Sequence, residues 1–144
     1  MRKQVSFALA LSMVMTSGMA TVANAAADDG KTNVVFWNSW TGGDGDTLEA
    51  LVNKFNEESD TVHVEMTRTT SFGDMLQTSL PTGEAADLVL LSTNEITRYK
   101  SYLRSMDDIW ENTGLKEEDF SPAYLNMCYN DDTLYAIPFQ ISTY

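Results

Sequence analysis

Aromatic and small polar side chains follow three separate apolar segments of this 144-residue chain. Trp40 and Thr41 follow the run 34–37, while Ser71-Phe72 and Ser92-Thr93 follow the segments 62–66 and 87–91. If these segments are parallel strands, their carboxyl ends meet at one edge of a sheet, where ligands bind in open α/β folds. An aromatic ring stacks on the apolar face of a sugar, and hydroxyls pair with its rim. The pattern therefore predicts a carbohydrate site.

Groups that could perform catalysis or hold a metal are scarce. His63 is the one histidine and stands in an alternating segment, where an exposed strand histidine is usually not a general base. Cys128 is the one cysteine, so we expect a small core residue rather than a metal ligand or half of a disulfide. We therefore expect no catalytic residue, no metal site and no cofactor. A secreted carbohydrate-active hydrolase stays open as an alternative, with Asp44 and Glu95 as the acid pair to nominate.

The glycine-rich segment 42–45 does not have the spacing of a phosphate-binding loop. It lacks the Gly-Lys-Ser/Thr ending, and Asp44 and Asp46 would repel an anion. We expect these glycines to allow a sharp turn from strand to helix and a close approach of the backbone to a ligand.

The elements that must position these residues alternate between strand and helix. The run 34–37 predicts a strand buried on both faces, and the alternation over 62–66 predicts a second strand. Between them, we expect a helix from Asp46 or Thr47 with one apolar stripe facing the sheet. Its members are Leu48, Leu51, Val52 and Phe55. A strand-helix-strand crossover of this kind makes the two strands parallel.

Further segments continue the α/β pattern. Ser71 and Asp74 resemble a capping box for a helix over 72–80, and 87–91 predicts a third buried strand. Residues 92–94 are expected to cap the next helix. The remaining expectations are a helix over 95–102, helical segments at 103–110 and 123–129, a tight turn at 130–133 and a strand over 134–138.

The first 25 residues have the pattern of a cleaved secretory signal peptide. A basic start precedes an apolar stretch, and Ala23-Asn24-Ala25 supplies the small residues of a cleavage site. Residues 26–144 then suffice for one domain in the periplasm or outside the cell, with no lipoprotein cysteine and no stable membrane anchor. The leader removes two basic residues and no acid, so the net charge falls from −12 to −14. Nucleic acid is excluded as a partner because no basic patch is present.

Four segments in register resemble one family. The run 35–42 with 48–56, the segment Ala85 to Leu91 and the segment Leu134 to Phe139 resemble the amino-terminal part of extracellular solute-binding proteins of carbohydrate-type ABC importers, the group that includes maltodextrin and glycerol-3-phosphate binders. The resemblance implies a periplasmic-binding-protein-like lobe in which helices flank a mainly parallel sheet. It also implies a sugar or oligosaccharide ligand and the membrane permease of the importer as partners.

By position, the resemblance implies that residues of several loops face the ligand. Besides the residues after the first three strands, it adds the segment Phe139 to Thr143. The expected ligand-binding residues are Trp40, Thr41, Asp44, Ser71, Phe72, Ser92, Thr93, Phe139 and Ser142. The family has a second lobe, so we expect these 144 residues to be an amino-terminal fragment, with a non-functional truncated product as a further alternative.

Overall fold

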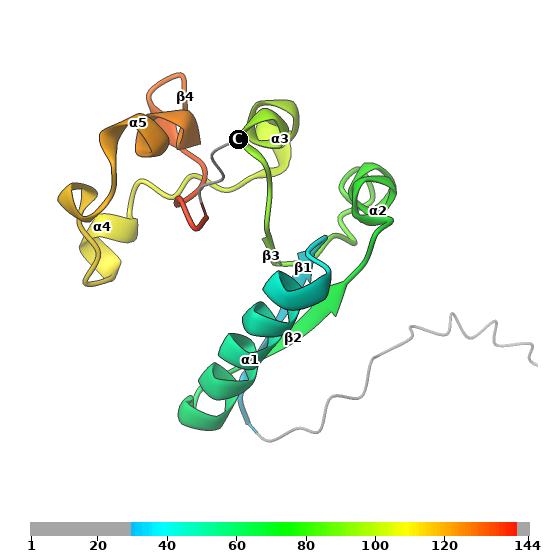
Figure 1. Ribbon diagram of the computed structural model, residues 1–144. Helices are drawn as coiled ribbons and strands as arrows, with labels where there is room; N and C mark the ends of the chain where they lie inside the picture. Colours follow the sequence, from blue (N-terminus) through cyan, green and yellow to red (C-terminus); the bar gives the residue numbers. More distant parts are fainter. Residues whose placement is uncertain (1–29, 141–144) are drawn as a thin grey trace, which may run out of the picture.

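A computed structural model describes residues 30–140, which form a three-stranded parallel sheet flanked by helices and a separate two-stranded hairpin (Figure 1). The predicted signal peptide and Ser142 lie outside the described residues. The elements are β1 (Thr32–Asn38), α1 (Gly42–Glu58), β2 (Val62–Arg68), α2 (Phe72–Ser79), β3 (Leu88–Val89), α3 (Thr93–Tyr99), η1 (Lys100–Tyr102), α4 (Ile109–Asn112), η2 (Glu117–Asp119), α5 (Pro122–Leu125), η3 (Asn126–Cys128), β4 (Tyr129–Asn130) and β5 (Thr133–Leu134).

The sheet has the order β2-β1-β3, so the strand that contains the apolar run 34–37 lies in the middle. β1 runs parallel to β2 from the pair Thr32 and Val62 to the pair Asn38 and Arg68. On its other side, Phe36 and Trp37 face Leu88 and Val89 of β3, again in parallel. The predicted α/β fold with parallel strands is confirmed, and the carboxyl ends of all three strands reach one edge.

The third strand is much shorter than the predicted 87–91, because only Leu88 and Val89 pair as a ladder. Before it, the carboxylate of Asp87 takes the place of a main-chain acceptor and receives the N–H of Val35 at 2.9 Å. After it, the N–H of Leu90 donates to the carbonyl of Trp37 at 3.1 Å. An apolar run alone does not reveal where a side chain replaces the ladder.

Helix α1 begins at Gly42, so the predicted start at Asp46 or Thr47 is wrong. The glycines form the first turn instead of a loop: Gly42 takes a φ of +58°, which glycine adopts without a steric penalty. The hydroxyl of Thr47 donates to the carbonyl of Gly43 at 2.8 Å within this turn. The glycines have a low helix propensity, but the backbone of Gly42 and the Thr47 hydrogen bond place them in the helix nevertheless.

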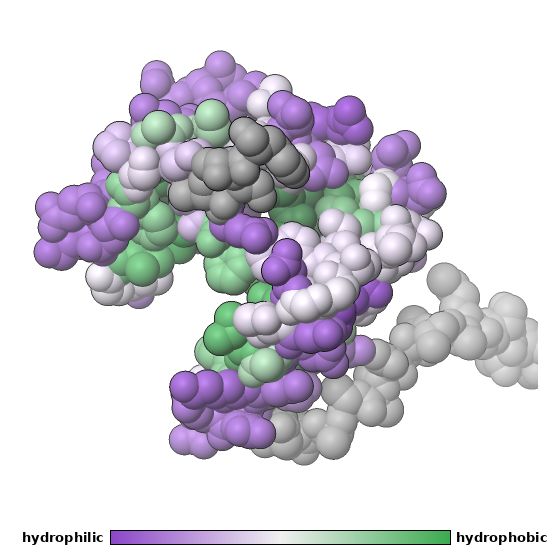
Figure 2. All heavy atoms as spheres, in the orientation of Figure 1, coloured by the Kyte–Doolittle hydropathy of each residue, from purple (hydrophilic) through white to green (hydrophobic). Residues whose placement is uncertain are grey.

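The predicted apolar stripe of α1 faces the sheet only in part. Leu48 is 6% exposed, whereas Leu51 is 54% and Phe55 is 45% exposed. The helix packs mainly along β2, and the described residues provide no further layer over the outer part of the stripe. Figure 2 shows hydrophobic residues in the recess between the lower part of the molecule, which contains α1, and the upper part, which contains α4 and α5.

Helix α2 lacks the predicted capping box. The side chain of Ser71 makes no capping hydrogen bond, so the prediction from Ser71 and Asp74 is wrong. Its backbone N–H instead donates to the hydroxyl of Thr69 at 3.1 Å. One face of the helix is apolar, and Phe72 and Leu76 bury themselves in the core.

Helix α3 has the reciprocal half of a capping box. The N–H and the hydroxyl of Ser92 both donate to Glu95 Oε2, each at 2.8 Å, which confirms the predicted cap at 92–94. Helix α3 proper ends at Tyr99, and η1 continues to Tyr102, so the predicted helix over 95–102 is present with a tighter last turn.

The carboxyl-terminal segments pack as short turns of helix and a small hairpin. α5 and η3 cover most of the helical segment predicted at 123–129. β4 and β5 are joined through Asp131 and Asp132, whose φ values of 49° and 63° confirm the predicted tight turn. The predicted strand over 134–138 is wrong, because the ladder ends at Leu134.

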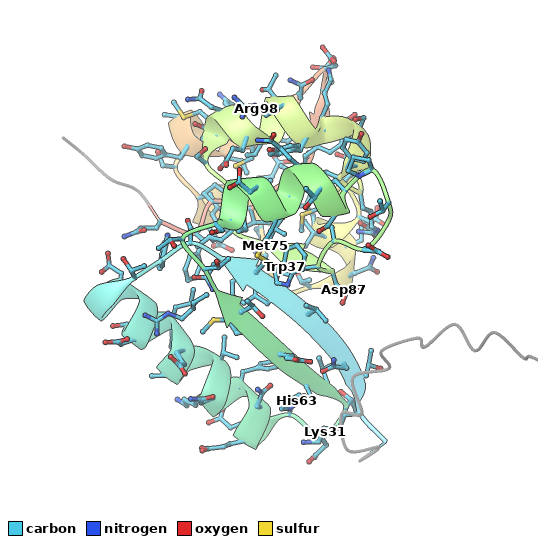
Figure 3. The ribbon with its side chains drawn as sticks, turned by 90° about the vertical axis from the view of Figure 1, so that its right-hand side faces the viewer. Lys31, Trp37, His63, Met75, Asp87 and Arg98 are labelled. Carbon is cyan, nitrogen blue, oxygen red and sulfur yellow. The ribbon has the colours of Figure 1, made fainter. Side chains whose placement is uncertain are left out.

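Two apolar clusters hold the molecule together. One joins Phe72, Leu76 and Tyr99 to the partly buried Trp37, and Figure 3 shows Trp37 beside Met75 between the sheet and α2. The other surrounds a fully buried Leu134 and contains Ile96, Leu125 and Cys128. Cys128 is thus the core residue that the sequence predicted. Within residues 30–140, none of the helices is both long and apolar enough to cross a membrane.

Candidate functional site: a cleft at the carboxyl ends of the strands

A cleft of about 560 Å³ lies where the chain leaves β1 and β3. Its walls come from the loop after β1, the start of α3, the α5–η3 turn and the segment 136–140. The lining residues used below are Ser39, Trp40, Ser92, Thr93, Glu95, Tyr124, Met127, Cys128, Phe139 and Gln140. Four of the predicted ligand residues are therefore brought together here, namely Trp40, Ser92, Thr93 and Phe139.

Two aromatic rings form the apolar wall of the cleft. The ring centroids of Trp40 and Phe139 are 5.7 Å apart, with 33° between the ring planes. The side chain of Trp40 is half-buried and that of Phe139 is 58% exposed, so part of the aromatic surface faces solvent. Such a surface can stack on the C–H face of a sugar ring.

The Trp40 main chain is held by a buried amide. Asn38, the last residue of β1, is 0% exposed, and its Oδ1 accepts the N–H of Trp40 at 3.1 Å. Its Nδ2 has no hydrogen-bond partner among the described residues. A fully buried amide with one unpaired group costs folding free energy. The bond that Asn38 does make fixes the main chain of the loop at Trp40.

The polar wall of the cleft comes from the first turn of α3. Ser92, Thr93 and Glu95 lie here because β3 ends just before them, and Gln140 adds an amide to the lining. Glu95 Oε2 is occupied by Ser92, which fixes the carboxylate at the rim. Among the described lining residues, Glu95 carries the one formal charge, so the cleft offers hydrogen-bond partners and a single negative charge.

Three residues of the α5–η3 turn line the cleft and were missed by the sequence analysis. They are Tyr124, Met127 and Cys128, from a segment that the pattern assigned to a helix without a role. Met127 is 53% exposed, and burial raises the pKa of the Cys128 thiol above its ordinary value. No pattern in the sequence marks these three residues, and only the fold brings this turn to the same cleft as Trp40.

Four predicted residues do not line the cleft. Thr41 and Asp44 lie exposed at the start of α1, and Ser71 is exposed before α2. Phe72 is 4% exposed and packs in the core with Leu76 and Tyr99. The loop after β2 thus contributes no residue to the described lining of the cleft, and Ser142 lies outside the described residues.

Groups for acid-base or metal chemistry do not converge on the cleft. Glu95 lines it while Asp44 does not, so the acid pair nominated for a hydrolase is not brought together. His63 is exposed, and Figure 3 shows it beside Lys31 at the opposite end of the sheet. Within residues 30–140, the acidic, histidine and cysteine side chains form no group of three that could hold a metal.

A second hollow, of about 1030 Å³, opens between η2 and the β4–β5 turn. It contains none of the predicted ligand residues, and its charged walls come from Lys116, Glu117, Glu118 and Asp132. The hydroxyl of Tyr129 donates to Glu117 at 3.2 Å, and burial together with this carboxylate raises the pKa of Tyr129. The described lining of this hollow contains no pair of aromatic rings, so the first cleft is the better candidate site.

No family model matches the chain, and no curated protein does. Solved structures do match. The sugar-binding protein MalE from Xanthomonas citri has a TM-score of 0.66 at 22% identity, over 74% of this chain and 28% of that one.

Two further solved structures agree with this match. The galacto-N-biose/lacto-N-biose I-binding protein of an ABC transporter from Bifidobacterium longum, in complex with lacto-N-biose, has a TM-score of 0.64 at 20% identity, over 78% of this chain and 29% of that one. A family 1 extracellular solute-binding protein from Alicyclobacillus acidocaldarius has a TM-score of 0.65 at 20% identity, over 75% and 28% of the two chains. The chain thus spans under a third of these structures. It shares with them the fold of a periplasmic-binding-protein-like lobe, in which helices flank a parallel sheet.

Proposed function

We propose that this protein is the extracytoplasmic solute-binding component of an ABC importer and that it binds a sugar or oligosaccharide. The observation that carries the proposal is the Trp40–Phe139 pair, which shares one cleft with hydroxyl, carboxylate and amide groups at the carboxyl ends of parallel strands. The fold shared with sugar-binding proteins supports it.

In this proposal the protein performs no chemistry on its ligand. The aromatic wall takes the C–H face of one sugar ring, while Ser92, Thr93 and Gln140 take hydroxyl groups. The protein then releases the sugar to the membrane permease of the importer. The predicted signal peptide over residues 1–25 supports a location in the periplasm or outside the cell.

Within this class, a neutral ligand is favoured over a phosphorylated one. A phosphate needs cationic or densely packed N–H partners, and the described cleft lining holds Glu95 but neither Lys nor Arg. The glycerol-phosphate branch of the family is therefore the weaker choice.

Isothermal titration tests the proposed function. The full chain is titrated with maltotriose, mannotriose and lacto-N-biose, with glycerol 3-phosphate and an amino acid mixture as the competing solute classes. We expect heat with at least one neutral sugar. Heat with glycerol 3-phosphate or the amino acids alone would overturn the sugar assignment, and turnover of chromogenic glycosides would favour the hydrolase alternative.

A further inference from the structure

Arg68 does not line the cleft, but it is hydrogen-bonded to the main chain of Trp40, which does. As the last residue of β2 it pairs in register with Asn38, the last residue of β1. Its Nε donates to the carbonyl oxygen of Trp40 at 3.3 Å. Since Asn38 Oδ1 accepts the N–H of Trp40 at 3.1 Å, both peptide groups of Trp40 are tied to the ends of the two strands.

The guanidinium group is itself fixed from the other side by α1. Nη1 donates to Asp46 Oδ1 at 3.0 Å and to Glu49 Oε2 at 2.7 Å. These two carboxylates raise the pKa of Arg68 above its ordinary value, Glu49 more than Asp46. The side chain of Arg68 is 25% exposed, and its positive charge is paired with the carboxylates of Asp46 and Glu49. It is therefore not available to a ligand in the cleft.

Gly45 makes room for this arrangement. A Cβ at this buried position would lie 2.7 Å from the Trp40 carbonyl oxygen and 2.7 Å from Arg68 Cζ. Real side chains do not approach a backbone oxygen so closely, so any other residue at position 45 forces the Trp40 loop and the guanidinium apart. At neighbouring Gly43, an added Cβ would meet nothing within 4 Å.

We propose that Arg68 is a positioning residue for ligand binding: it holds the Trp40 main chain between β1, β2 and α1 so that the indole meets Phe139 and the sugar. The sugar-binding part of this inference rests on the proposed function. Arg68 does not touch the ligand, and its planar fork cannot be replaced by the single ammonium of lysine. A purely structural ion pair between β2 and α1 would instead affect stability alone.

The test follows the Trp40 ring directly by fluorine NMR of the full chain labelled with 5-fluorotryptophan. The sequence has three tryptophans, and loss of one resonance in Trp40→Phe assigns the signal. In Arg68→Met and Arg68→Lys we expect the Trp40 resonance to shift or broaden while those of Trp37 and Trp110 stay. Arg104→Met is the matched control, since it removes an equally charged side chain whose exposed partner is Asp108 at 2.6 Å.

A second pair of variants avoids any change of charge. Gly45→Ala should disturb the Trp40 resonance, and Gly43→Ala should leave it unchanged. This pair tests whether close packing at position 45 fixes the Trp40 loop, while Arg68→Lys decides the role of Arg68 if Arg68→Met fails to fold. An undisturbed Trp40 resonance in folded Arg68→Lys would overturn the proposal.

Affinity supplies the functional arm. With the neutral sugar that gives heat with the parent chain, we expect Arg68→Lys to weaken binding about tenfold or more and Arg104→Met to leave it within about twofold. If no sugar binds the parent chain, the proposed function fails, but the fluorine spectra still decide whether Arg68 positions Trp40. Unchanged affinity in a folded Arg68→Lys would refute the functional role.

Discussion

At the scale of single residues, the candidate site depends on one aromatic pair and on what holds it. Trp40 contributes the ring, but Asn38 and Arg68 determine where the ring lies, through hydrogen bonds to the two peptide groups of Trp40. Phe139 then completes the surface from a distant part of the chain. The identity of a residue suggests its chemistry, and its neighbours decide whether that chemistry is available.

Removing either ring should weaken sugar binding. Trp40→Ala and Phe139→Ala are each expected to cost about 1–3 kcal/mol of binding free energy, because each deletes apolar surface that covers a sugar face. Titration calorimetry measures the loss. Tyr102→Ala is the control, since Tyr102 is 51% exposed and does not line the cleft. Equal affinity in all three variants would contradict the stacking role.

Asn38 should be important for stability in a way that depends on its replacement. Asn38→Ala removes the acceptor for the Trp40 N–H and opens a cavity, for an expected cost of about 2–3 kcal/mol. Asn38→Leu fills the space and removes the unpartnered Nδ2, so its cost should be smaller, about 1–2 kcal/mol. Urea unfolding gives both values, and a larger cost for leucine would argue against this account.

At the scale of elements, the carboxylates of two aspartates replace main-chain acceptors beside strands. Asp87 receives the N–H of Val35 beside β1, and Asp107 receives the N–H of Leu134 at 2.9 Å beside β5. These bonds let short strands end without orphaned donors.

The hydrogen bond from the N–H of Leu134 to Asp107 should make the stability of the protein depend on pH in acid. The hydrogen bond from Leu134, with that from Ser105, holds the pKa of Asp107 below its ordinary value of 3.8. A carboxylate with a depressed folded-state pKa contributes stability above its unfolded pKa, and this contribution is lost as the pH falls through the folded value. Below about pH 4, Asp107→Asn should therefore lose less stability on acidification than the parent chain.

Thermal melts between pH 6 and pH 2.5 measure this difference. Asp60→Asn is the matched control, because it makes the same change of side chain at an exposed position that is distant in sequence from Asp107 and Leu134. Parallel curves for Asp107→Asn and the parent chain would show that the Leu134 bond does not contribute to acid stability.

At the scale of the whole molecule, charge and shape restrict the ligand. The chain carries a net charge of −12, and the described cleft lining adds Glu95 without a compensating Lys or Arg. Arg68, whose guanidinium donates to the Trp40 carbonyl, forms ion pairs with Asp46 and Glu49. Anionic ligands are therefore repelled both at long range and in the cleft.

Binding of a neutral sugar should accordingly be nearly independent of salt. Between about 50 and 500 mM NaCl, the affinity should change by less than about twofold, since no ligand charge is present to be screened. The phosphorylated counterpart of the same sugar should bind weakly at every salt concentration. Tighter binding of the phosphorylated form at low salt would contradict the charge assignment.

The sequence by itself determined the α/β class, the parallel crossover, the cap of α3 and the buried Cys128. It could do so because periodicity and local hydrogen bonding are properties of neighbouring residues. It also predicted Trp40 as a ligand residue, and the structure places Trp40 in the cleft. Boundaries were wrong where glycines form the first turn of α1 from Gly42, and where the Asp87 side chain takes the place of a main-chain acceptor just before β3. Only the tertiary structure showed that Phe72 is core, that Thr41 and Asp44 lie outside the cleft, and that Tyr124, Met127 and Arg68 surround or support Trp40. These contacts join segments far apart in the chain, and their formation depends on packing that no local pattern encodes.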